Sequence, residues 1–512
     1  MNILKKWFRS LFRRRVHVML LLLLQILLIL YFVMSGSKYL WINHTLTIMS
    51  LLVALHIVSK HDKIAYKLTW VFLILLFPVF GGLFYLLFKF QSSTRRFSKQ
   101  LDIIDDRTNE LYLLPNNNKI KQNSVLEEYS TLLDYLQKFA NFPLYDHTES
   151  KFLASGEVMY EEMLDELKKA EKYIFLEYFI VKEGIMWNSI LEILEEKIKA
   201  GIEVRIMYDD MGCFLGLPKD YSDTLEKKGI KCLVFNKFRP FLTAVQNNRD
   251  HRKIAIIDGK VAFTGGINLS DEYINAYERF GHWKDAGIKI SGKAAWSFTL
   301  MFLQMWSICK RENINFLDYY PWYNNKCPNR NDGYIQPYAD SPMDKENIGE
   351  HVYLHIINGA KKYLYINTPY LIIDDSMVSA LKLAAKSGVD VRITVPHRWD
   401  KKLIHFTTRS YYRDLIKSGV RIYEYSKGFI HSKSFISDDK IATMGTTNLD
   451  FRSLYLHFEC GTCIYDAKCI DDMKKDFTDT LEECIEITQE DCKGNILTRF
   501  LQDVCRLFAP LM

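Results

Sequence analysis

The chain has 512 residues, more than one compact core usually holds, so at least two folding units are expected. Charged residues make up 25% and hydrophobic residues 48%, which excludes a disordered chain and leaves room for membrane-embedded segments. A formal charge of +6 is small for this length and predicts no nucleic-acid partner.

Residues 1–90 are predicted to form a membrane anchor of two or three transmembrane helices. Residues 16–34 and 68–88 are almost wholly apolar, and each is long enough to cross a bilayer, which takes about 20 residues. Residues 40–58 are a weaker third candidate because they contain several polar side chains. Six Lys and Arg side chains between Lys5 and Arg15 would be drawn to anionic lipid head groups.

The side of the membrane follows from the number of spans. The basic N-terminus is expected in the cytoplasm, so two spans would return the rest of the chain to the cytoplasm and three would place it outside. Ten cysteines are present, none before Cys213, which favours a reducing compartment. We therefore predict a multi-pass cell-membrane protein with its catalytic part on the cytoplasmic face, and the oligomeric state stays open.

Residues 91–142 are polar and are predicted to be a linker without regular structure. From residue 143 the pattern becomes globular. Helical spacing over 156–170 precedes an apolar strand at 173–181, and a helix over 185–200 precedes a strand at 201–208. Helices that alternate with apolar strands predict an α/β domain.

The same pattern recurs later in the chain. YIFLEYFI is answered by YLYINTPYLI, AGIEVRIMYDD by SGVDVRITVPH, and HRKIAIIDGKVAFTGGIN by HSKSFISDDKIATMGTTN, in the same order and at similar separations. The chain is therefore predicted to hold two copies of one α/β unit, over residues 143–325 and 326–512. Two copies packed with approximate two-fold symmetry would bring equivalent residues face to face.

Each copy carries one histidine-containing motif with the same spacing. The first is His251, Lys253, Asp258, Gly265, Gly266 and Asn268, and the second is His431, Lys433, Asp438, Gly445, Thr446 and Asn448. His and Lys two residues apart on a strand point to one face. A hairpin would then bring the Gly backbone and the Asn side chain beside them, where they could bind a phosphate.

This set of side chains suits phosphodiester exchange. One neutral imidazole would attack phosphorus and the opposite, protonated imidazole would give its proton to the leaving alcohol. The lysines and asparagines would stabilise the negative charge of the transition state. Asp285 and Glu459, each in a strand that follows a motif, could each hold a ring nitrogen of a histidine. A single C-x-x-C pair, Cys460 and Cys463, lacks the second pair of a zinc site, and no metal or cofactor is expected.

Several polar residues have simpler explanations. Asp258 and Asp438 lie at turns, so a structural role is as well supported as a catalytic one. His282 and His457 lack a lysine partner and are interpreted as structural. Glu177 and Arg452 are each interpreted as part of a structural ion pair. Tyr178 and Tyr370 are interpreted as core or pocket-lining side chains.

The paired H-x-K-x4-D motifs resemble those of the phospholipase D superfamily, and the chain is most similar to bacterial cardiolipin synthases. The similarity covers LEYFI, HWKD, TPY, SGVDVRI and GFIHSKSFISDDKIATMGTTNLDFRS as well as the apolar N-terminus. It implies two phospholipase D-like α/β sandwich units, and an enzyme that joins two phosphatidylglycerols into cardiolipin and releases glycerol through a phosphohistidine, without a metal. By this resemblance His251 is the nucleophile. One departure is Leu371 and Ile373 after TPY, where the family often has Phe and Pro.

Three other functions are weighed against this one. A phospholipase D-type hydrolase would use water as the acceptor, and a related transferase would use another lipid alcohol. A nuclease of the same superfamily is disfavoured by the small net charge and the predicted anchor. A protein without activity is disfavoured because both motifs are intact.

Overall fold

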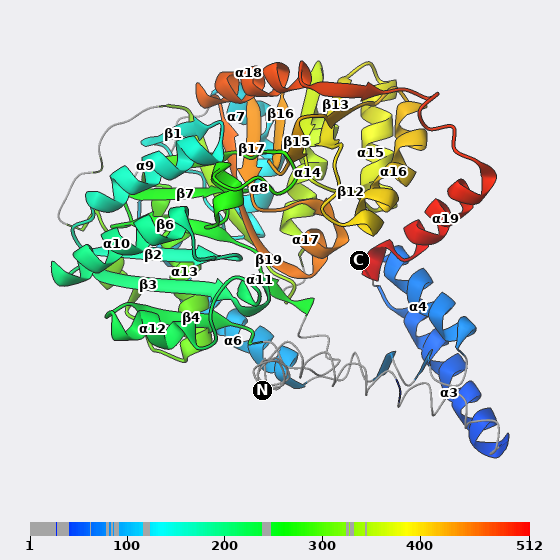
Figure 1. Ribbon diagram of the computed structural model, residues 1–512, viewed down its shortest axis with the longest axis horizontal. Helices are drawn as coiled ribbons and strands as arrows, with labels where there is room; N and C mark the ends of the chain where they lie inside the picture. The colour runs from blue at the N-terminus through cyan, green and yellow to red at the C-terminus, as the bar shows by residue number, and fades with distance from the viewer. Residues whose placement is uncertain are drawn as a thin grey trace, which may run out of the picture. The chain divides into compact units, whose positions relative to one another are not determined.

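The computed structural model describes residues 27, 40–61, 63–77, 81–82, 85–86, 92–115, 123–237, 247–323, 327, 332–343 and 346–511. The chain forms two compact units (Figure 1). One contains residues 1–95 with 238–247 and Leu511, and the other contains residues 96–237 and 248–510.

The first unit is built around helices α3 (Leu40–Ser59) and α4 (Ile64–Leu76). They pack through a small buried cluster that includes Val53, Ile57 and Ile74. Among the described residues, no helix is both long enough and apolar enough to span a bilayer. The predicted span 16–34 lies, apart from Leu27, outside the described residues, and the predicted span 68–88 lies partly outside them.

The second unit contains two large sheets. The first has the strand order β1 (Thr148–Leu153), β9 (Gly287–Gly292), β7 (Val261–Gly265), β6 (Lys253–Ile257), β2 (Tyr173–Tyr178), β3 (Glu203–Asp209) and β4 (Lys231–Phe235). The second begins β10 (Tyr334–Asp340), β19 (His457–Tyr465), β17 (Ile441–Gly445), β16 (Ser434–Ser437), β11 (Tyr363–Asn367), β13 (Asp390–Pro396), β14 (Arg421–Tyr425) and ends at β20 (Cys484–Ile487). The first seven strands of each sheet follow the same order and direction, which confirms the duplicated α/β unit.

Helices connect and cover the strands. They are α9 (Gly156–Lys168), α10 (Ile185–Lys199), α11 (Asp210–Cys213), α12 (Tyr221–Lys227) and α13 (Ala295–Lys310) in the first repeat, and α14 (Ile348–Gly359), α15 (Asp375–Lys386), α16 (Lys402–Ile416), α17 (Phe451–Tyr455), α18 (Cys469–Leu481) and α19 (Ile496–Leu507) in the second. Helices α9 and α10 lie along the first sheet in Figure 1. The two sheets meet where β17 contacts β7 and β9.

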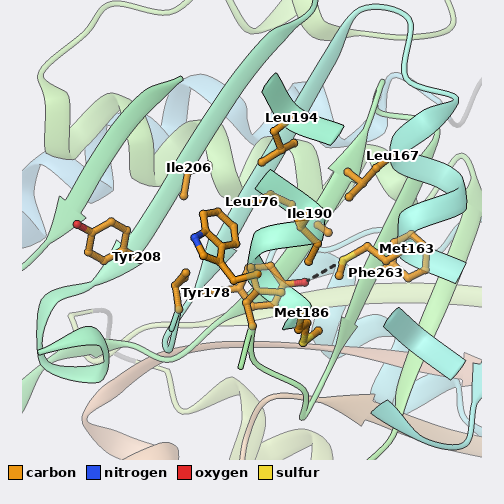
Figure 2. Close-up of a cluster of buried hydrophobic side chains, with 14 of the residues drawn as sticks. Met163, Leu167, Leu176, Tyr178, Met186, Ile190, Leu194, Ile206, Tyr208 and Phe263 are labelled. Carbon is orange, nitrogen blue, oxygen red and sulfur yellow. Dashed lines mark hydrogen bonds between the residues drawn. The ribbon is translucent and has the colours of Figure 1, made fainter. Parts of the chain in front are cut away.

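The core of the first repeat lies between the sheet and its helices. Leu167, Leu176, Ile190 and Leu194 are fully buried there (Figure 2). The hydroxyl of Tyr178 donates to the sulfur of Met163 at 3.7 Å, so Tyr178 is a core residue. Central strands such as β2 and β6 are buried at every position, which is typical of strands that are covered on both faces of the sheet.

Within 91–142, the residues that the structure describes, 92–115 and 123–142, do not form the irregular linker that the sequence predicts. They contain α6 (Ser92–Thr108), α7 (Ser124–Glu128) and α8 (Ser130–Lys138). Thr108 is fully buried and its hydroxyl accepts a hydrogen bond from Gln304 of α13 at 2.7 Å. The sequence pattern does not indicate α6, because its few buried positions are polar or lie among charged residues. This weakens the apolar periodicity on which the prediction of a helix depends.

Candidate active site

Each motif histidine lies against a strand of the other repeat. Residues immediately before His251 form β5 (Arg249–Asp250), which pairs in parallel with β19, and the His251 N–H donates to the Phe458 carbonyl at 2.9 Å. Residues before His431 form β15 (Gly428–Ile430), which pairs in parallel with β8 (His282–Lys284), and the His431 N–H donates to the Lys284 carbonyl at 2.7 Å. The two arrangements are equivalent, so the repeats exchange short strands around one site.

The two carboxylates are exchanged in the same way. His251 Nδ1 lies 2.8 Å from Glu459 Oε1, and His431 Nδ1 lies 2.7 Å from Asp285 Oδ2. Both carboxylates are fully buried. Each ring is therefore oriented through Nδ1 by an acid of the opposite repeat, which leaves Nε2 for chemistry.

The site favours neutral imidazoles. Burial, and then the charge of Lys253, lowers the pKa of His251 well below its usual value. Burial, and then Lys433, lowers the pKa of His431 to about 4, although Asp285 opposes this shift. The charges of His431 and Lys433 also act on His251, which indicates that the two motifs belong to one electrostatic site.

The pKa values of the two carboxyl groups are shifted in opposite directions. Burial raises the pKa of Glu459 well above its usual value, with Lys253 opposing. Burial would also raise the pKa of Asp285, but His431 and Lys433 outweigh it and hold the pKa below its usual value. The His431 side of the site therefore carries a fixed negative charge, whereas Glu459 holds a proton more readily.

Both motif lysines are buried beside the histidines. Lys253 Nζ donates to the His251 carbonyl at 2.6 Å, and Lys433 Nζ lies 2.9 Å from His431 Nδ1. Burial lowers the pKa of Lys253 to about 8 and that of Lys433 to about 7. Burial disfavours the charged form of both lysines. A bound anion would offset this cost and stabilise the two ammonium groups.

The Gly-Gly and Gly-Thr steps provide space for the carboxylates. A Cβ at Gly266 would lie 2.0 Å from Asp285 Oδ1, so only glycine fits there. In the second repeat the Thr446 hydroxyl instead donates to Glu459 Oε2. Gly265 has φ +148°, and a Cβ there would lie 2.6 Å from the Ala286 carbonyl oxygen. These residues therefore position the carboxylates, and their predicted contact with a phosphate stays a prediction.

The two asparagines are placed differently from each other. Asn268 Oδ1 accepts from the Ile180 N–H at 3.0 Å, and its Nδ2 donates to the Tyr273 hydroxyl at 2.8 Å. Asn448 is also buried, but in the part of the chain that the structure describes its Oδ1 has no hydrogen-bond partner. Asn268 therefore holds the loop behind the site, whereas the Oδ1 atom of Asn448 can still accept a hydrogen bond.

Asp258 and Asp438 are structural, which corrects their assignment to the catalytic set. Asp258 accepts hydrogen bonds from the backbone N–H groups of residues 171–173 at 2.7–2.9 Å, and Asp438 does the same for residues 361–363. Each lies one residue beyond the end of the strand that follows the motif histidine, β6 or β16, and so about 16 Å along the chain from the motif lysine. They anchor the start of β2 and β11.

His457 is a site residue that sequence reasoning missed. Its ring lies 5.4 Å from that of His251 and is buried, with 7% of the residue exposed. Neither ring nitrogen has a hydrogen-bond partner among the described residues, although Nδ1 lies 3.9 Å from Glu459 Oε1. The equivalent residue of the first repeat, Trp283, lies 5.2 Å from the His431 ring. The available signal was spacing, because each residue lies two positions before the carboxylate and so shares its face of the strand.

One group of side chains has the geometry of metal ligands. Ligand atoms of His251, His457 and Glu459 lie within 4.8 Å of one another. The pKa of His251 is nevertheless lowered by the charges of Lys253 and Lys433, so a cation at this position would meet the same repulsion. The surrounding charges favour a phosphate over a metal ion.

Comparisons with known proteins agree with this geometry. The family model described as "Cardiolipin synthase, PLD-like domain" matches residues 163–301 and 353–481, and "Phospholipase_D-nuclease N-terminal" matches residues 48–89. A cardiolipin synthase of Alkalihalophilus pseudofirmus is 36% identical over 87% of this chain and 88% of its own length. An uncharacterized protein of Streptococcus mutans is 43% identical over 90% of this chain and 99% of its own length. A phosphatidylserine synthase structure from Haemophilus influenzae superposes with a TM-score of 0.55 at 15% identity, covering 76% of this chain and 100% of that one, which supports the fold.

Proposed function

This chain belongs to the cardiolipin synthase family with phospholipase D-like domains, and we propose that it transfers a phosphatidyl group between two phosphatidylglycerols to give cardiolipin and glycerol. The observation that carries this proposal is the pair of histidines, each held by a carboxylate of the other repeat, beside two buried lysines. Such a site offers a nucleophile, a proton donor and positive charge to one phosphodiester.

The first half-reaction forms a covalent intermediate. His251 Nε2 attacks phosphorus of the first phosphatidylglycerol, the bond to the glycerol oxygen breaks, and the leaving oxygen takes a proton from His431. The anionic phosphodiester, bound beside His431, raises the lowered pKa of this ring and so allows it to be protonated. Asp285 stays ionised and stabilises the imidazolium of His431. The product is phosphatidyl-His251 and free glycerol.

The second half-reaction uses a second phosphatidylglycerol. His431, now neutral, takes the proton of its terminal glycerol hydroxyl, and the oxygen attacks phosphorus as the bond to His251 breaks. Lys253 and Lys433 would stabilise the negative charge that develops on the phosphoryl oxygens in both steps. The cycle releases one cardiolipin and regenerates both histidines.

The membrane assignment is also part of the proposal. The apolar runs in residues 1–90 and the family match over residues 48–89 support an N-terminal anchor in the cell membrane. The cysteines favour a catalytic part on the cytoplasmic face. Phosphatidylglycerol and other anionic lipids are the expected partners.

The test is the product made by the purified chain from phosphatidylglycerol in detergent micelles. We expect equal amounts of glycerol and a diphosphatidyl product, identified by mass spectrometry. Phosphatidic acid as the sole lipid product would assign the chain to the hydrolases instead.

A further inference from the structure

Two segments beside the active site expose apolar side chains to solvent. The segment after β3 exposes Met211 of α11 by 40% and Leu215 by 69%, and the segment after β13 exposes Trp399 by 52% and Leu403, in the first turn of α16, by 55%. We propose that these four residues, the apolar rim, are the surface that inserts into a bilayer containing phosphatidylglycerol. This rests on the proposed function, because it assigns how that site reaches its lipid.

The first segment is joined to the His251 side of the site. A Cβ at Gly212 would lie 2.0 Å from the Phe179 carbonyl oxygen, and Cys213 Sγ accepts from the Val181 N–H at 3.1 Å. The Phe179 ring lies 5.0 Å from the His251 ring. Phe179 therefore lies between His251 and the segment that carries Met211 and Leu215.

The second segment is joined to the opposite side. Asp400 accepts a hydrogen bond from the Tyr370 hydroxyl at 2.6 Å, and Lys401 Nζ donates to the same hydroxyl at 3.4 Å. Tyr370 packs against the buried cluster that contains Trp283 and Tyr273, whose rings lie 5.2 Å and 5.6 Å from the His431 ring. Trp399 and Leu403 thus flank the same site from the second repeat.

The two segments occupy equivalent places in the duplicated fold. β3 and β13 are equivalent strands, and each segment follows the carboxyl end of its strand, where α/β sheets bind ligands. Soluble surfaces tolerate single exposed apolar residues, but two equivalent pairs on either side of one site indicate a common contact. The duplication therefore places apolar anchors on both sides of the site.

The charge of the second segment fits an anionic lipid surface. Arg398, Lys401 and Lys402 are exposed around Trp399 and Leu403. Tryptophan is favoured at the interface between head groups and acyl chains, and each basic side chain near an anionic surface adds attraction. The cations would neutralise the negative charge of phosphatidylglycerol head groups. An apolar surface of a partner protein would have no such charge for them to bind.

The test compares two presentations of one substrate to the full chain. Variants Leu215→Glu and Trp399→Glu are assayed on vesicles of phosphatidylglycerol and phosphatidylcholine, and on detergent-solubilised enzyme given short-chain phosphatidylglycerol. We expect at least a tenfold loss of turnover on vesicles for each variant, with turnover on the short-chain lipid within threefold of wild type. Leu383→Glu is the matched control, because Leu383 is 63% exposed near the end of α15, away from the rim.

Each outcome separates the two proposals. Equal turnover of rim variants and wild type on vesicles overturns the rim, as does an equal loss on both substrates. Absence of diphosphatidyl product from wild type on both substrates overturns the proposed function instead. A second measurement follows quenching by brominated phosphatidylglycerol vesicles. The wild-type quenching should exceed that of Trp399→Phe, and identical quenching, or rim-dependent dimerisation without quenching, would also refute bilayer insertion.

Discussion

His251 Nδ1 is hydrogen-bonded to Glu459 Oε1 at 2.8 Å, although the two residues belong to different repeats. The reciprocal bond joins His431 to Asp285. Because each catalytic ring depends on the other repeat, neither repeat contains a complete site. Duplication in this chain is therefore a requirement of the site as well as of the fold.

Replacing Glu459 by Gln should lower kcat much more than it lowers stability. The amide can fill the same space, but its NH2 group can face His251 Nδ1 and favour the tautomer that carries the proton on Nε2, which cannot attack phosphorus, so we expect a loss of about 10²–10⁴-fold. Turnover of phosphatidylglycerol measures this effect, with the melting temperature as the folding control. Unchanged kcat in a folded Glu459→Gln variant would show that the cross-repeat bond has no role in catalysis.

Replacing Asp258 by Ala should have the opposite profile. The change leaves three backbone N–H groups of residues 171–173 without their charged acceptor, which should cost roughly 1.5–3 kcal/mol of unfolding free energy or more. We expect kcat of the folded fraction to stay within a few-fold of wild type. Denaturant unfolding and turnover per folded molecule check this, and a thousandfold loss of kcat at unchanged stability would return Asp258 to the catalytic set.

The lysines predict a falling pH limb in kcat/KM. Lys433 and Lys253 have pKa values of about 7 and about 8, and each binds a phosphodiester well only when protonated. Both are charged below these values, and the charge is lost as the pH rises through them, so KM for phosphatidylglycerol should rise over this range. Lys433→Arg should move the limb to higher pH because arginine stays charged. A flat profile across the same range would be inconsistent with these lysines binding the phosphate.

His457→Phe should separate function from stability. The wild-type ring nitrogens are buried, and no described residue hydrogen-bonds to them, so an apolar ring of similar size should leave the melting temperature unchanged or raise it. Turnover should fall about tenfold or more, because the ring beside His251 loses its polar atoms. His457→Gln should recover part of the activity. Full activity in His457→Phe would make the residue structural, as its sequence context alone suggested.

The repeat, the α/β class and the two His-Lys pairs could be predicted because they are encoded in local patterns. Apolar strands, helical spacing and a motif that occurs twice do not depend on distant contacts. The exchange of Asp285 and Glu459 between repeats could not be predicted, because the pairing depends on how β5 and β15 join strands of the other sheet. The structural role of Asp258 and the helices within residues 91–142 likewise depend on tertiary contacts that a single sequence does not display.

The central claim is that two histidines act in turn on one phosphorus, and a substrate with an activated leaving group tests it most directly. Phosphatidyl-p-nitrophenol releases a phenolate that needs no proton from His431. His431→Ala should therefore give a burst of about one equivalent of nitrophenol and accumulate phosphatidyl-His251, seen by mass spectrometry, whereas His251→Ala should give neither. A full burst from His251→Ala, or normal turnover of phosphatidylglycerol by either variant, would contradict the account.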